Sequence, residues 1–309
     1  MKNPRPSVAI VMSLYDPDPD YLMVQLESLF DQDYPVTLFI RVDGRGYEQL
    51  CSCLDMLKYD SDQLCVFVEE NIGFTASFLK CLSYAEADLF AFADQDDYWV
   101  SHKIASAVNC LSGMDQKSVV PALCYCDMVF TDATLAPLEN QPDRAHDNTF
   151  YNAISEIPIS GVTMVFNNSL RKEILKGDPK KLPGHDWWAY LLASSLGFVV
   201  HDTAKGVYYR RHENNVSTFS NNKIAIMKRR FSDYISGEKL KPIRSMYREF
   251  YKIFKDDFRL SERDLRLASL LAGEDSLMNR LKKCFFPVRF RRNLLDDFLF
   301  RLLFVFGLL

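Results

Sequence analysis

The sequence predicts an α/β fold, with a mainly parallel, doubly wound sheet followed by a helical C-terminal region. Short apolar runs alternate with amphipathic helical patterns through the first half of the chain, which is typical of repeated β-α units. After about Asn221 strand signals become rare, while basic residues and helical periodicity continue to the C-terminus. We therefore expect an α/β domain over residues 1–220 and a helical region over residues 221–309.

The β-α units begin with a buried strand at residues 7–14. Asp18-Pro19 then resembles an N-cap followed by proline at the first helical position, and this helix extends to Phe30. No G-x-G-x-x-G motif follows the first strand, which argues against a dinucleotide-binding fold of the dehydrogenase type. The remaining expected elements are strands at 37–42, 64–68, 89–93, 123–130, 159–166, 198–202 and 207–210, and helices at 47–58, 73–85, 102–111 and 185–195.

The composition is that of a globular protein. Its 309 residues are 48% hydrophobic and 25% charged, which excludes a disordered chain and allows one large domain with an accessory region. The formal net charge of −4 argues against nucleic acid as a partner. The aromatic content of 13% fits a protein that handles sugars or contacts a membrane.

The eight cysteines indicate a reducing compartment. Several lie in apolar strand or helix patterns, and the C-x-C pairs lack the spacing of a zinc site. No signal peptide is visible, because the short apolar stretch at residues 8–14 runs into the acidic, proline-rich residues 16–20. The sequence therefore predicts free thiols in a cytoplasmic protein.

Three carboxylates follow the apolar run at residues 89–93, in the segment Asp94-Gln95-Asp96-Asp97. Carboxylates at the end of a buried strand are costly unless their charge is compensated, and ligands of open α/β sheets bind at the carboxyl ends of the strands. Oxygen ligands suit Mg²⁺ or Mn²⁺, which commonly hold diphosphates. A solvated acidic turn is the alternative, but the preceding strand favours a metal that grips a nucleotide diphosphate.

Seven short segments together carry a resemblance to a known family, and they are Val8–Tyr15, Arg41–Gly44, Asn71–Phe74, Asp94–Trp99, Ser160-Gly161, His185–Trp188 and Arg210–Asn215. In this order, over about residues 7–217, they resemble the family 2 glycosyltransferases, which are inverting nucleotide-sugar enzymes of the GT-A fold. The D-Q-D-D-x-W form with a late R-x-H-x-x-N is most similar to bacterial rhamnosyltransferases of surface-polysaccharide assembly.

The resemblance assigns the nucleotide to the ends of the first two strands. Asp43 matches the acidic residue that contacts the base, although the family usually has a second acid where this chain has Val42. Ser13 and Tyr15 match positions that line the nucleobase pocket, where a Tyr face stacks and a hydroxyl bonds to ring groups. Asn71, with Gly73, is expected to shape the floor beside the nucleotide; turn-forming roles explain Asp43 and Asn71 as well, and packing explains Tyr15.

The resemblance assigns the metal and the diphosphate to four further positions. Asp96 is expected to ligate Mn²⁺ or Mg²⁺, and Asp94 to contact the ribose or the metal. His212 is a second candidate metal ligand, and Arg211 a candidate for the donor phosphate. The alternative for these two is an ordinary surface loop.

The remaining positions of these segments are expected to play supporting roles. Asp97 either supports the metal site or caps a following helix, and Trp99 is expected to pack in the core. Ser160-Gly161 is expected to let the backbone approach the donor or acceptor closely.

Asp186 is the candidate general base. Inverting transfer requires one carboxylate to take the proton of the acceptor hydroxyl. A carboxylate that opens the aromatic helix containing Trp187 and Trp188 fits this task, and the alternative is an N-cap Asp with tryptophans in the core. His185 stands where the family more often has an acid, so its role stays open.

The tail at residues 277–309 mixes basic residues with Leu and Phe, a pattern that favours an anionic membrane surface. A helix packed on the protein or a dimer seam explains it nearly as well. The final apolar run at 302–309 is too short to span a bilayer. We therefore expect a protein peripheral on the inner face of the cell membrane.

These observations predict an inverting glycosyltransferase that moves a sugar from a nucleoside-diphosphate sugar to a lipid-linked surface or capsular polysaccharide intermediate. By resemblance the leading donor is dTDP-rhamnose, and UDP-galactose, UDP-glucose and UDP-N-acetylhexosamines are alternatives. A catalytically silent glycan- or nucleotide-binding subunit is the hypothesis from another class. A sugar-phosphate nucleotidyltransferase is disfavoured, because Asp16-Pro17-Asp18-Pro19 stands where a glycine-rich basic loop would be needed.

Overall fold

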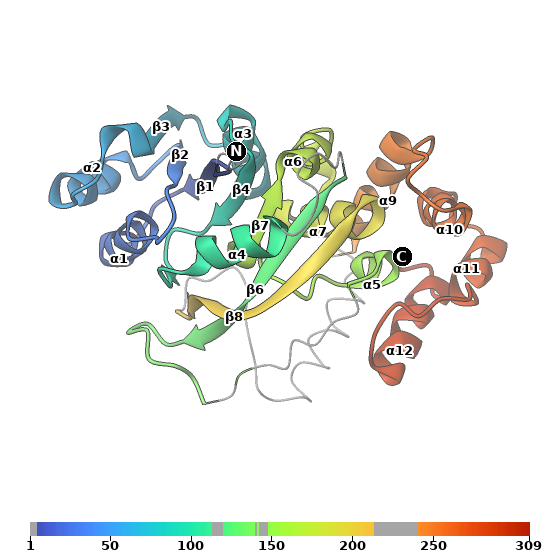
Figure 1. Ribbon diagram of the computed structural model, residues 1–309. Helices are drawn as coiled ribbons and strands as arrows, with labels where there is room; N and C mark the ends of the chain where they lie inside the picture. Colours follow the sequence, from blue (N-terminus) through green and yellow to red (C-terminus); the bar gives the residue numbers. More distant parts are fainter. Residues whose placement is uncertain (1–4, 113–119, 140, 142–147, 213–239) are drawn as a thin grey trace. The chain divides into compact units, whose positions relative to one another are not determined.

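The computed structural model describes residues 5–112, 120–139, 141, 148–212 and 240–309 (Figure 1). The chain forms two compact units. The first, here the sheet unit, comprises Met1–Asp143, Ile159–Leu175 and Phe198–Asn215, and the second, here the helical unit, comprises Arg144–Pro158, Lys176–Gly197 and Val216–Leu309. The helical unit thus takes two segments from the middle of the chain, and the predicted boundary after residue 220, which lies outside the described residues, stays a prediction.

The sheet unit contains every strand that the structure describes. Their order in the sheet is β3-β2-β1-β4-β7-β6-β8-β5. The pairs among β1 to β4 are parallel, as is β6 with β8, whereas β7 pairs antiparallel with both of its neighbours and β5 with β8. The strands are β1 Val8–Leu14, β2 Thr37–Asp43, β3 Leu64–Glu69, β4 Leu89–Ala93, β5 Tyr98–Trp99, β6 Ala122–Thr131, β7 Met164–Asn167 and β8 Phe198–Arg210.

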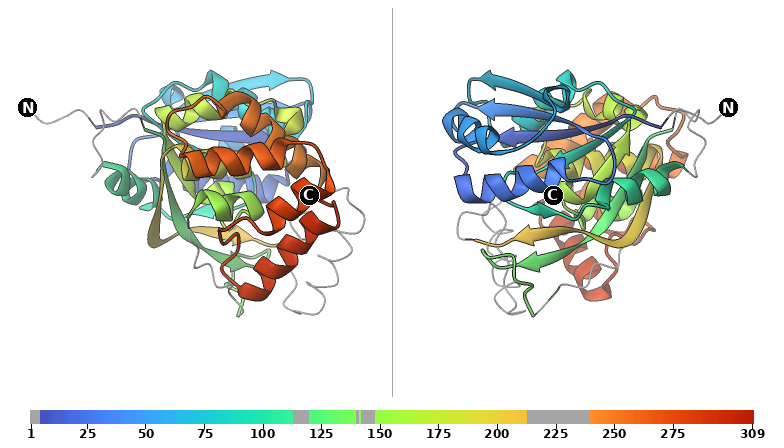
Figure 2. Two further views of the ribbon diagram at one scale, coloured as in Figure 1. Left: turned by 90° about the vertical axis from the view of Figure 1, so that its right-hand side faces the viewer. Right: turned by 60° about the vertical axis from the view of Figure 1, so that its left-hand side comes forward.

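Helices cover both faces of this sheet (Figure 2, right). Alternate residues of a strand point to opposite faces, and Val8, Ile10, Met12 and Leu14 of β1 pack in one core with α1, α2 and α4. α3 lies on the other face, where the Ser77 hydroxyl meets Ser13. The helices of this unit are α1 Pro19–Phe30, α2 Tyr47–Met56, α3 Phe74–Tyr84, α4 Lys103–Ser112 and α6 Asn168–Ile174.

Sequence patterns and structure differ mainly after β4. The expected strand at 159–166 begins as a 3-10 turn, η2 Gly161–Thr163, and only its end forms β7. The two strands expected at 198–202 and 207–210 form one strand, β8, because polar residues between them alternate between exposed and half-buried positions along the partner β6. The expected N-cap is confirmed, since the Asp18 carboxylate accepts hydrogen bonds from the backbone N–H groups of Asp20 and Tyr21.

The helical unit contains α5 Phe150–Ser155, α7 His185–Leu196, α9 Lys241–Phe254, α10 Glu262–Ala272, α11 Leu277–Cys284 and α12 Leu294–Val305, together with the 3-10 turn η3 Pro179–Lys181. Aromatic side chains hold it together: Trp188 of α7 is fully buried and packs against Phe250 and Phe254 of α9. The helical periodicity predicted for the C-terminal region is therefore confirmed over residues 241–305.

Candidate functional site

The predicted nucleotide-binding residues of the sheet unit lie where three neighbouring parallel strands end. In the register of the sheet, Ser13 of β1 is level with Arg41 of β2, and Met12 is level with Ala93, the residue before the acidic segment. Gln95 joins these ends, because its amide accepts from the Tyr15 N–H at 3.0 Å and donates to the Tyr15 carbonyl at 3.1 Å. The structure thus brings Ser13, Tyr15, Asp43 and Asp94 to one edge of the sheet.

Asp43 is buried rather than open at this edge. Its carboxylate pairs with the Arg41 guanidinium and accepts from the backbone N–H groups of Ile72 and Gly73 at 2.8 and 3.1 Å. Asn71 donates to the Asp43 carbonyl at 3.1 Å, so the structure brings these two predicted residues together. A carboxylate has about four acceptor positions, and the described contacts use three of them. Asp43 therefore shapes the loop beside the strand ends in addition to any contact with a base.

A hydrogen-bond chain connects Ser13 to this pair. The Ser13 hydroxyl donates to Ser77 at 2.5 Å, and Arg41 donates to the same Ser77 oxygen at 2.9 Å. Arg41 also binds Glu69 at 2.8 Å and the carbonyl of Glu70 at 2.7 Å. Tyr15 differs, because the residue is 42% exposed, its hydroxyl accepts from Arg45, and the Arg45 guanidinium carbon lies 5.1 Å from its ring centroid. Stacking of this ring on a base stays a prediction.

The acidic loop after β4 is held by the end of β8. Arg210 is buried, and its Nε donates to the Asp96 carbonyl at 2.7 Å while its backbone N–H donates to the Asp97 carboxylate at 3.0 Å. The Arg210 guanidinium carbon lies 4.3 Å from the ring centroid of Tyr21, and that ring lies 5.2 Å from the His212 ring. The end of α1 nearest the sheet edge and the end of β8 therefore enclose the acidic loop together.

The same arrangement brings Asp96 and His212 together. His212 Nε2 lies 2.9 Å from Asp96 Oδ2, and both side chains are partly buried. Successive side chains near the end of a strand point to opposite sides, so Arg211 points away from its two neighbours. The contacts described for the Arg211 guanidinium are with the rings of Phe130 and Tyr209. The arginine that contacts the acidic loop is Arg210, to which the sequence assigned no role of its own.

Asp97 is fully buried and is followed by β5, so the expectation that it caps a helix is wrong. Burial, with the neighbouring carboxylates of Asp96 and Asp94, raises the pKa of Asp97 well above its usual value. Trp99 of β5 is buried, as expected. Gly161, also buried, opens the η2 turn that packs against β4 and β6.

The donor atoms of this edge fit a divalent metal that is shared with a diphosphate. Among the described residues no group of three or more His, Cys, Asp or Glu side chains could hold a metal by itself. Mg²⁺ is ordinarily bound by one or two protein groups together with substrate phosphates and water. Asp96 and His212 supply two adjacent ligands of this kind, and imidazole is also compatible with transition metals.

Asp186 lies in the helical unit, in the first turn of α7. The N-cap of this helix is Gly184, so the alternative in which Asp186 is the N-cap is wrong. Asp186 Oδ1 accepts from the Trp187 N–H at 2.8 Å, and a Cβ atom at Gly184 would lie only 2.6 Å from this oxygen. Gly184 therefore leaves room for the carboxylate at a helix end that favours negative charge.

The neighbours of Asp186 fix this turn. Trp187 donates through Nε1 to the carbonyl of Ala153 at 2.7 Å, and Trp188 lies in the core. His185 is also fully buried; burial lowers its pKa to about 4, and the adjacent Asp186 carboxylate opposes this shift only in part. His185 is therefore a neutral side chain at neutral pH, unlike the acid that the family more often has there.

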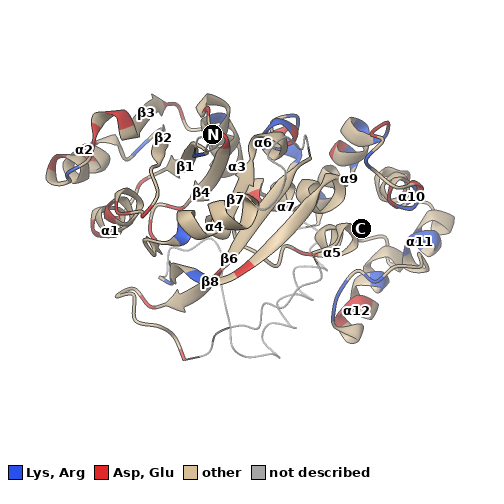
Figure 3. Cartoon of the chain, in the orientation of Figure 1, with Lys and Arg blue, Asp and Glu red and all other residues tan. Residues whose placement is uncertain are grey.

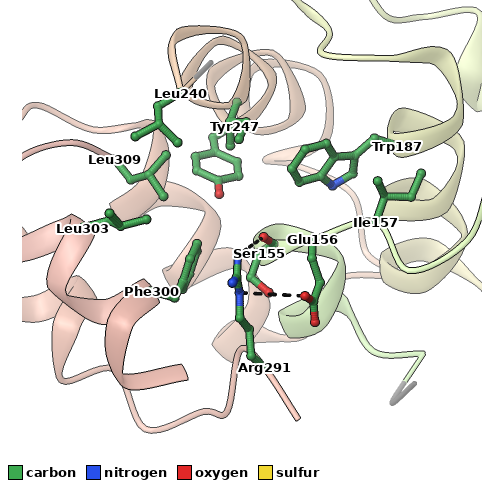
Figure 4. Close-up of a pocket in the computed structure, with 11 residues that line it drawn as sticks. Ser155, Glu156, Ile157, Trp187, Leu240, Tyr247, Arg291, Phe300, Leu303 and Leu309 are labelled. Atoms are coloured by element: carbon green, nitrogen blue, oxygen red, sulfur yellow. Dashed lines mark hydrogen bonds and ion pairs between the residues drawn. The ribbon is translucent and has the colours of Figure 1, made fainter. Parts of the chain in front are cut away.

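A pocket of about 240 Å³ opens beside Trp187 within the helical unit (Figure 4). Its walls are mostly apolar, and include Trp187, Tyr247 and Phe300. Arg291 crosses its floor, where it donates to the Ser155 carbonyl at 3.0 Å and lies 3.9 Å from the Glu156 carboxylate. The sequence indicated no pocket here, because its residues come from several separate segments between Ser155 and Leu309.

Comparison with known proteins identifies the family. The sequence profile described as "Glycosyl transferase family 2" matches residues 9–177, which is more than half of the chain. The chain belongs to glycosyltransferase family 2. The profile covers the nucleotide-binding edge through Gly161, whereas Asp186, Arg211 and His212 follow the matched segment.

Similar sequences are bacterial glycosyltransferases by name. The chain is 28% identical over 204 residues, 62% of its length, to the dTDP-rhamnosyl transferase RfbG of Shigella flexneri, 68% of which is covered. It is 24% identical over 241 residues, 78% of its length, to the putative teichuronic acid biosynthesis glycosyltransferase TuaG of Bacillus subtilis (strain 168), 92% of which is covered.

Solved structures share the fold. S. aureus TarS 1–349 in complex with UDP-GlcNAc matches with a TM-score of 0.53 and 14% identity, over 96% of this chain and 90% of that chain. The chain spans about half, 54%, of the longer TarS chain that it also matches. The predicted GT-A fold with a helical C-terminal region is thereby confirmed, and the chain is a family 2 glycosyltransferase. Among the described residues, no helix is long and apolar enough to cross a membrane.

Proposed function

We propose that the chain transfers a sugar from a nucleoside-diphosphate sugar to an acceptor hydroxyl with inversion at the anomeric carbon. The observation that carries this proposal is the pair formed by Asp96 and His212 at the carboxyl ends of the parallel strands, in a chain of glycosyltransferase family 2. The pair lies at the edge to which the resemblance assigns the donor. Arg210 holds the backbone of the acidic loop by donating to the Asp96 carbonyl.

In this proposal the nucleotide binds at the ends of β1 and β2. The exposed Tyr15 ring stacks on the base, and Ser13 with the loop that Asp43 orders lines the same pocket. Asp94 contacts the ribose, Arg211 contacts the diphosphate, and Gly161 lets the backbone approach the donor. Asp96 and His212 would hold a Mn²⁺ or Mg²⁺ ion, which supplies Lewis-acid stabilisation of the departing diphosphate.

Asp186 is the proposed general base. Its Oδ1 is engaged by the Trp187 N–H, which leaves Oδ2 to accept the proton of the acceptor hydroxyl. As that proton leaves, the acceptor oxygen bonds to the anomeric carbon, and the bond from this carbon to the phosphate oxygen breaks with its electron pair on the diphosphate. Trp187, through its bond to the Ala153 carbonyl, and the buried Trp188 hold the turn that carries this carboxylate, and a fixed orientation raises the rate because catalysis depends on alignment.

We propose rhamnose, delivered as dTDP-rhamnose, as the favoured sugar, and a lipid-linked surface polysaccharide intermediate at the inner membrane face as the acceptor. The name of the Shigella relative supports the donor, and the name of the Bacillus relative supports polysaccharide assembly. Galactosyl, glucosyl or N-acetylhexosaminyl transfer by the same fold is the alternative for the donor.

A donor-hydrolysis screen tests the proposal. Purified protein is incubated with Mn²⁺ or Mg²⁺ and a panel of nucleotide sugars, and released dTDP or UDP is measured. We expect metal-dependent release from one donor and its loss in Asp96→Asn, while Asp256→Asn, a change at an acid that is 89% exposed, leaves it intact. Release that is unaffected by Asp96→Asn would contradict the metal site. If no donor is hydrolysed, transfer is measured with a membrane extract as the acceptor source, and silence there would favour the catalytically silent binding subunit.

A further inference from the structure

Among the described residues, the C-terminal helices carry many large apolar side chains that are exposed. Of the described residues, half of the large hydrophobic side chains that are exposed lie between positions 277 and 306. We call them the outer apolar surface, and they are Leu277, Met278, Leu281 and Phe285 on and just after α11, and Leu294, Leu295, Phe298, Leu299 and Phe306 on and just after α12. α11 and α12 contact each other (Figure 2, left).

The exposed side chains of α12 form one continuous stripe. At 100° per residue, the five members on and after α12 fall within an arc of about 140°. The buried side chains of the helix, Phe300, Leu303 and Phe304, fall in the opposite arc. α12 therefore has two apolar faces. The inner face, formed by Phe300, Leu303 and Phe304, is buried in the protein, and the outer face is exposed.

Hydrogen bonds hold the inner face of α12 against the protein, so the outer face is not exposed through a misplaced rotation of the helix. Asp297 accepts from the backbone N–H groups of Phe290 and Arg291 at 2.6 and 3.0 Å, and from Arg301 Nε at 2.7 Å. These contacts set the rotation of α12 about its axis. Burying the outer stripe would require breaking them.

Basic residues occur along and between α11 and α12, the helices that carry the outer apolar surface (Figure 3). Residues 277–309 contain seven Lys and Arg against two Asp, in a chain whose formal net charge is −4. Lys282, Arg289 and Arg292 are exposed. On α11, Lys282 is about 40° around the helix axis from Met278, so it borders the exposed apolar side chains of that helix. Neither of the two acids lies in the outer stripe: Asp297 is buried and Asp296 falls on another side of the helix.

We propose that the outer apolar surface docks on an anionic lipid bilayer, with α11 and α12 lying in the plane of the interface. Leu and Phe side chains would enter the boundary between head groups and acyl chains, and Lys282, Arg289 and Arg292 would meet anionic head groups. α12 has 12 residues, about 18 Å of helix, and a span of the hydrocarbon core needs about 30 Å. Docking on the surface is thus the geometry that its length allows.

Charge favours a bilayer over a second copy of the chain. A two-fold symmetric contact places the same patch on both sides, so the three basic residues of each copy would border those of the other. No exposed acid in the stripe would compensate them. An anionic bilayer supplies both the apolar phase and the opposite charge.

The first test measures co-sedimentation of the full chain with phosphatidylcholine vesicles, with and without phosphatidylglycerol. Vesicle binding requires neither a sugar donor nor an acceptor, so its outcome is independent of the proposed transfer reaction. We expect binding to the anionic vesicles that decreases as salt increases. Equal binding to both vesicle types, or binding to neither, would overturn the proposal.

Substitutions locate the surface. Leu294→Ser with Phe298→Ser should weaken binding by about tenfold or more, since each buried apolar side chain contributes strongly. Met56→Ser with Phe258→Ser is the matched control, because these side chains are 70% and 95% exposed elsewhere, and it should bind as the wild type does. Unchanged binding by the first variant would overturn the assignment.

Charge reversal of Lys282, Arg289 and Arg292 to Glu should abolish the preference for anionic vesicles. The matched control reverses Lys58, Lys172 and Lys180, which are exposed elsewhere. Thermal melting checks that each variant folds. If the charge-reversed variant melts at a lower temperature than the wild type, the test is decided by Leu294→Ser with Phe298→Ser. Light scattering completes the test: a dimer that Leu294→Ser with Phe298→Ser dissociates, without vesicle binding by the wild type, would show a contact between copies instead.

Discussion

The two units hold their candidate catalytic groups in opposite ways. In the sheet unit, Asp43 and Asp96 are tied to other charged side chains, Arg41 and His212, and to the loop backbone. In the helical unit, Asp186 lies in the first turn of α7, and the side chains of its neighbours His185 and Trp188 are buried. Removing a charge should therefore disturb the fold in the first unit and only the chemistry in the second.

The largest expected effect is on catalysis in the helical unit. Asp186→Asn should lower the rate of transfer by about 10²- to 10⁴-fold, since it removes the general base and keeps the shape of the side chain. Nucleotide binding and the melting temperature should stay near those of the wild type. Steady-state transfer, calorimetric titration with nucleotide and thermal melting measure the three quantities. Full activity of this variant would remove Asp186 from the mechanism.

The counterpart in the sheet unit is Asp43→Asn. This change leaves the buried Arg41 without one of its two carboxylate partners, and breaking such a pair costs about 3 kcal/mol of unfolding free energy. Urea unfolding at neutral pH measures this loss. Asp62→Asn, at an exposed acid of the same unit, is the control. If Asp43→Asn weakened nucleotide binding at unchanged stability, the contrast between the units would fail.

His185 gives the helical unit a sensitivity to acid. Its folded pKa is about 4, below the ordinary value of 6.5, so the unfolded chain binds the proton first as the pH falls. The resulting loss of unfolding free energy begins near pH 6.5 and is complete near pH 4, and it amounts to about 3 kcal/mol. Urea unfolding across this range should show a shallower slope in His185→Gln. An unchanged slope would show that burial does not lower the pKa of His185 in the folded state.

The smallest effect separates two adjacent arginines. Arg210→Met removes the donor to the Asp96 carbonyl, and support of this kind is worth about ten- to a hundredfold in metal affinity. Arg211→Met should leave Mn²⁺ affinity in place and weaken only the binding of the diphosphate. Titration of Mn²⁺ in the presence and absence of nucleotide measures both. Equal metal affinity of the two variants would contradict the positioning role of Arg210.

The sequence was most informative where a residue's environment is local. β1 and β4 are buried on both faces and read as continuous apolar runs, so their positions and the acidic loop that follows β4 were predicted. β5 and β7 have two and four residues, too few for a periodic signal. An arginine in a strand gives no sign of burial by itself, so the contact between Arg41 and Asp43 could not be foreseen.

Contacts between distant segments were likewise beyond a pattern analysis. Arg210 and Tyr21 pack around the acidic loop from two other parts of the chain. Each belongs to an ordinary helical or strand pattern. The pairing of Asp96 with His212 could be proposed only because the resemblance assigned both to the metal, and their distance came from the structure.

That pairing has a consequence for the order in which the protein is made. Asp96 and His212 are 116 residues apart, so a ribosome that adds about 5–20 residues per second needs on the order of 10 s to pass from one to the other. During that interval the nascent chain carries the nucleotide edge and the acidic loop without the imidazole or the Arg210 support. A chain that stops before β8 could therefore gather the strands that bear Ser13 and Asp43 and still lack a complete metal pair. Competence for the proposed reaction arrives only with the last strand of the sheet to be synthesised.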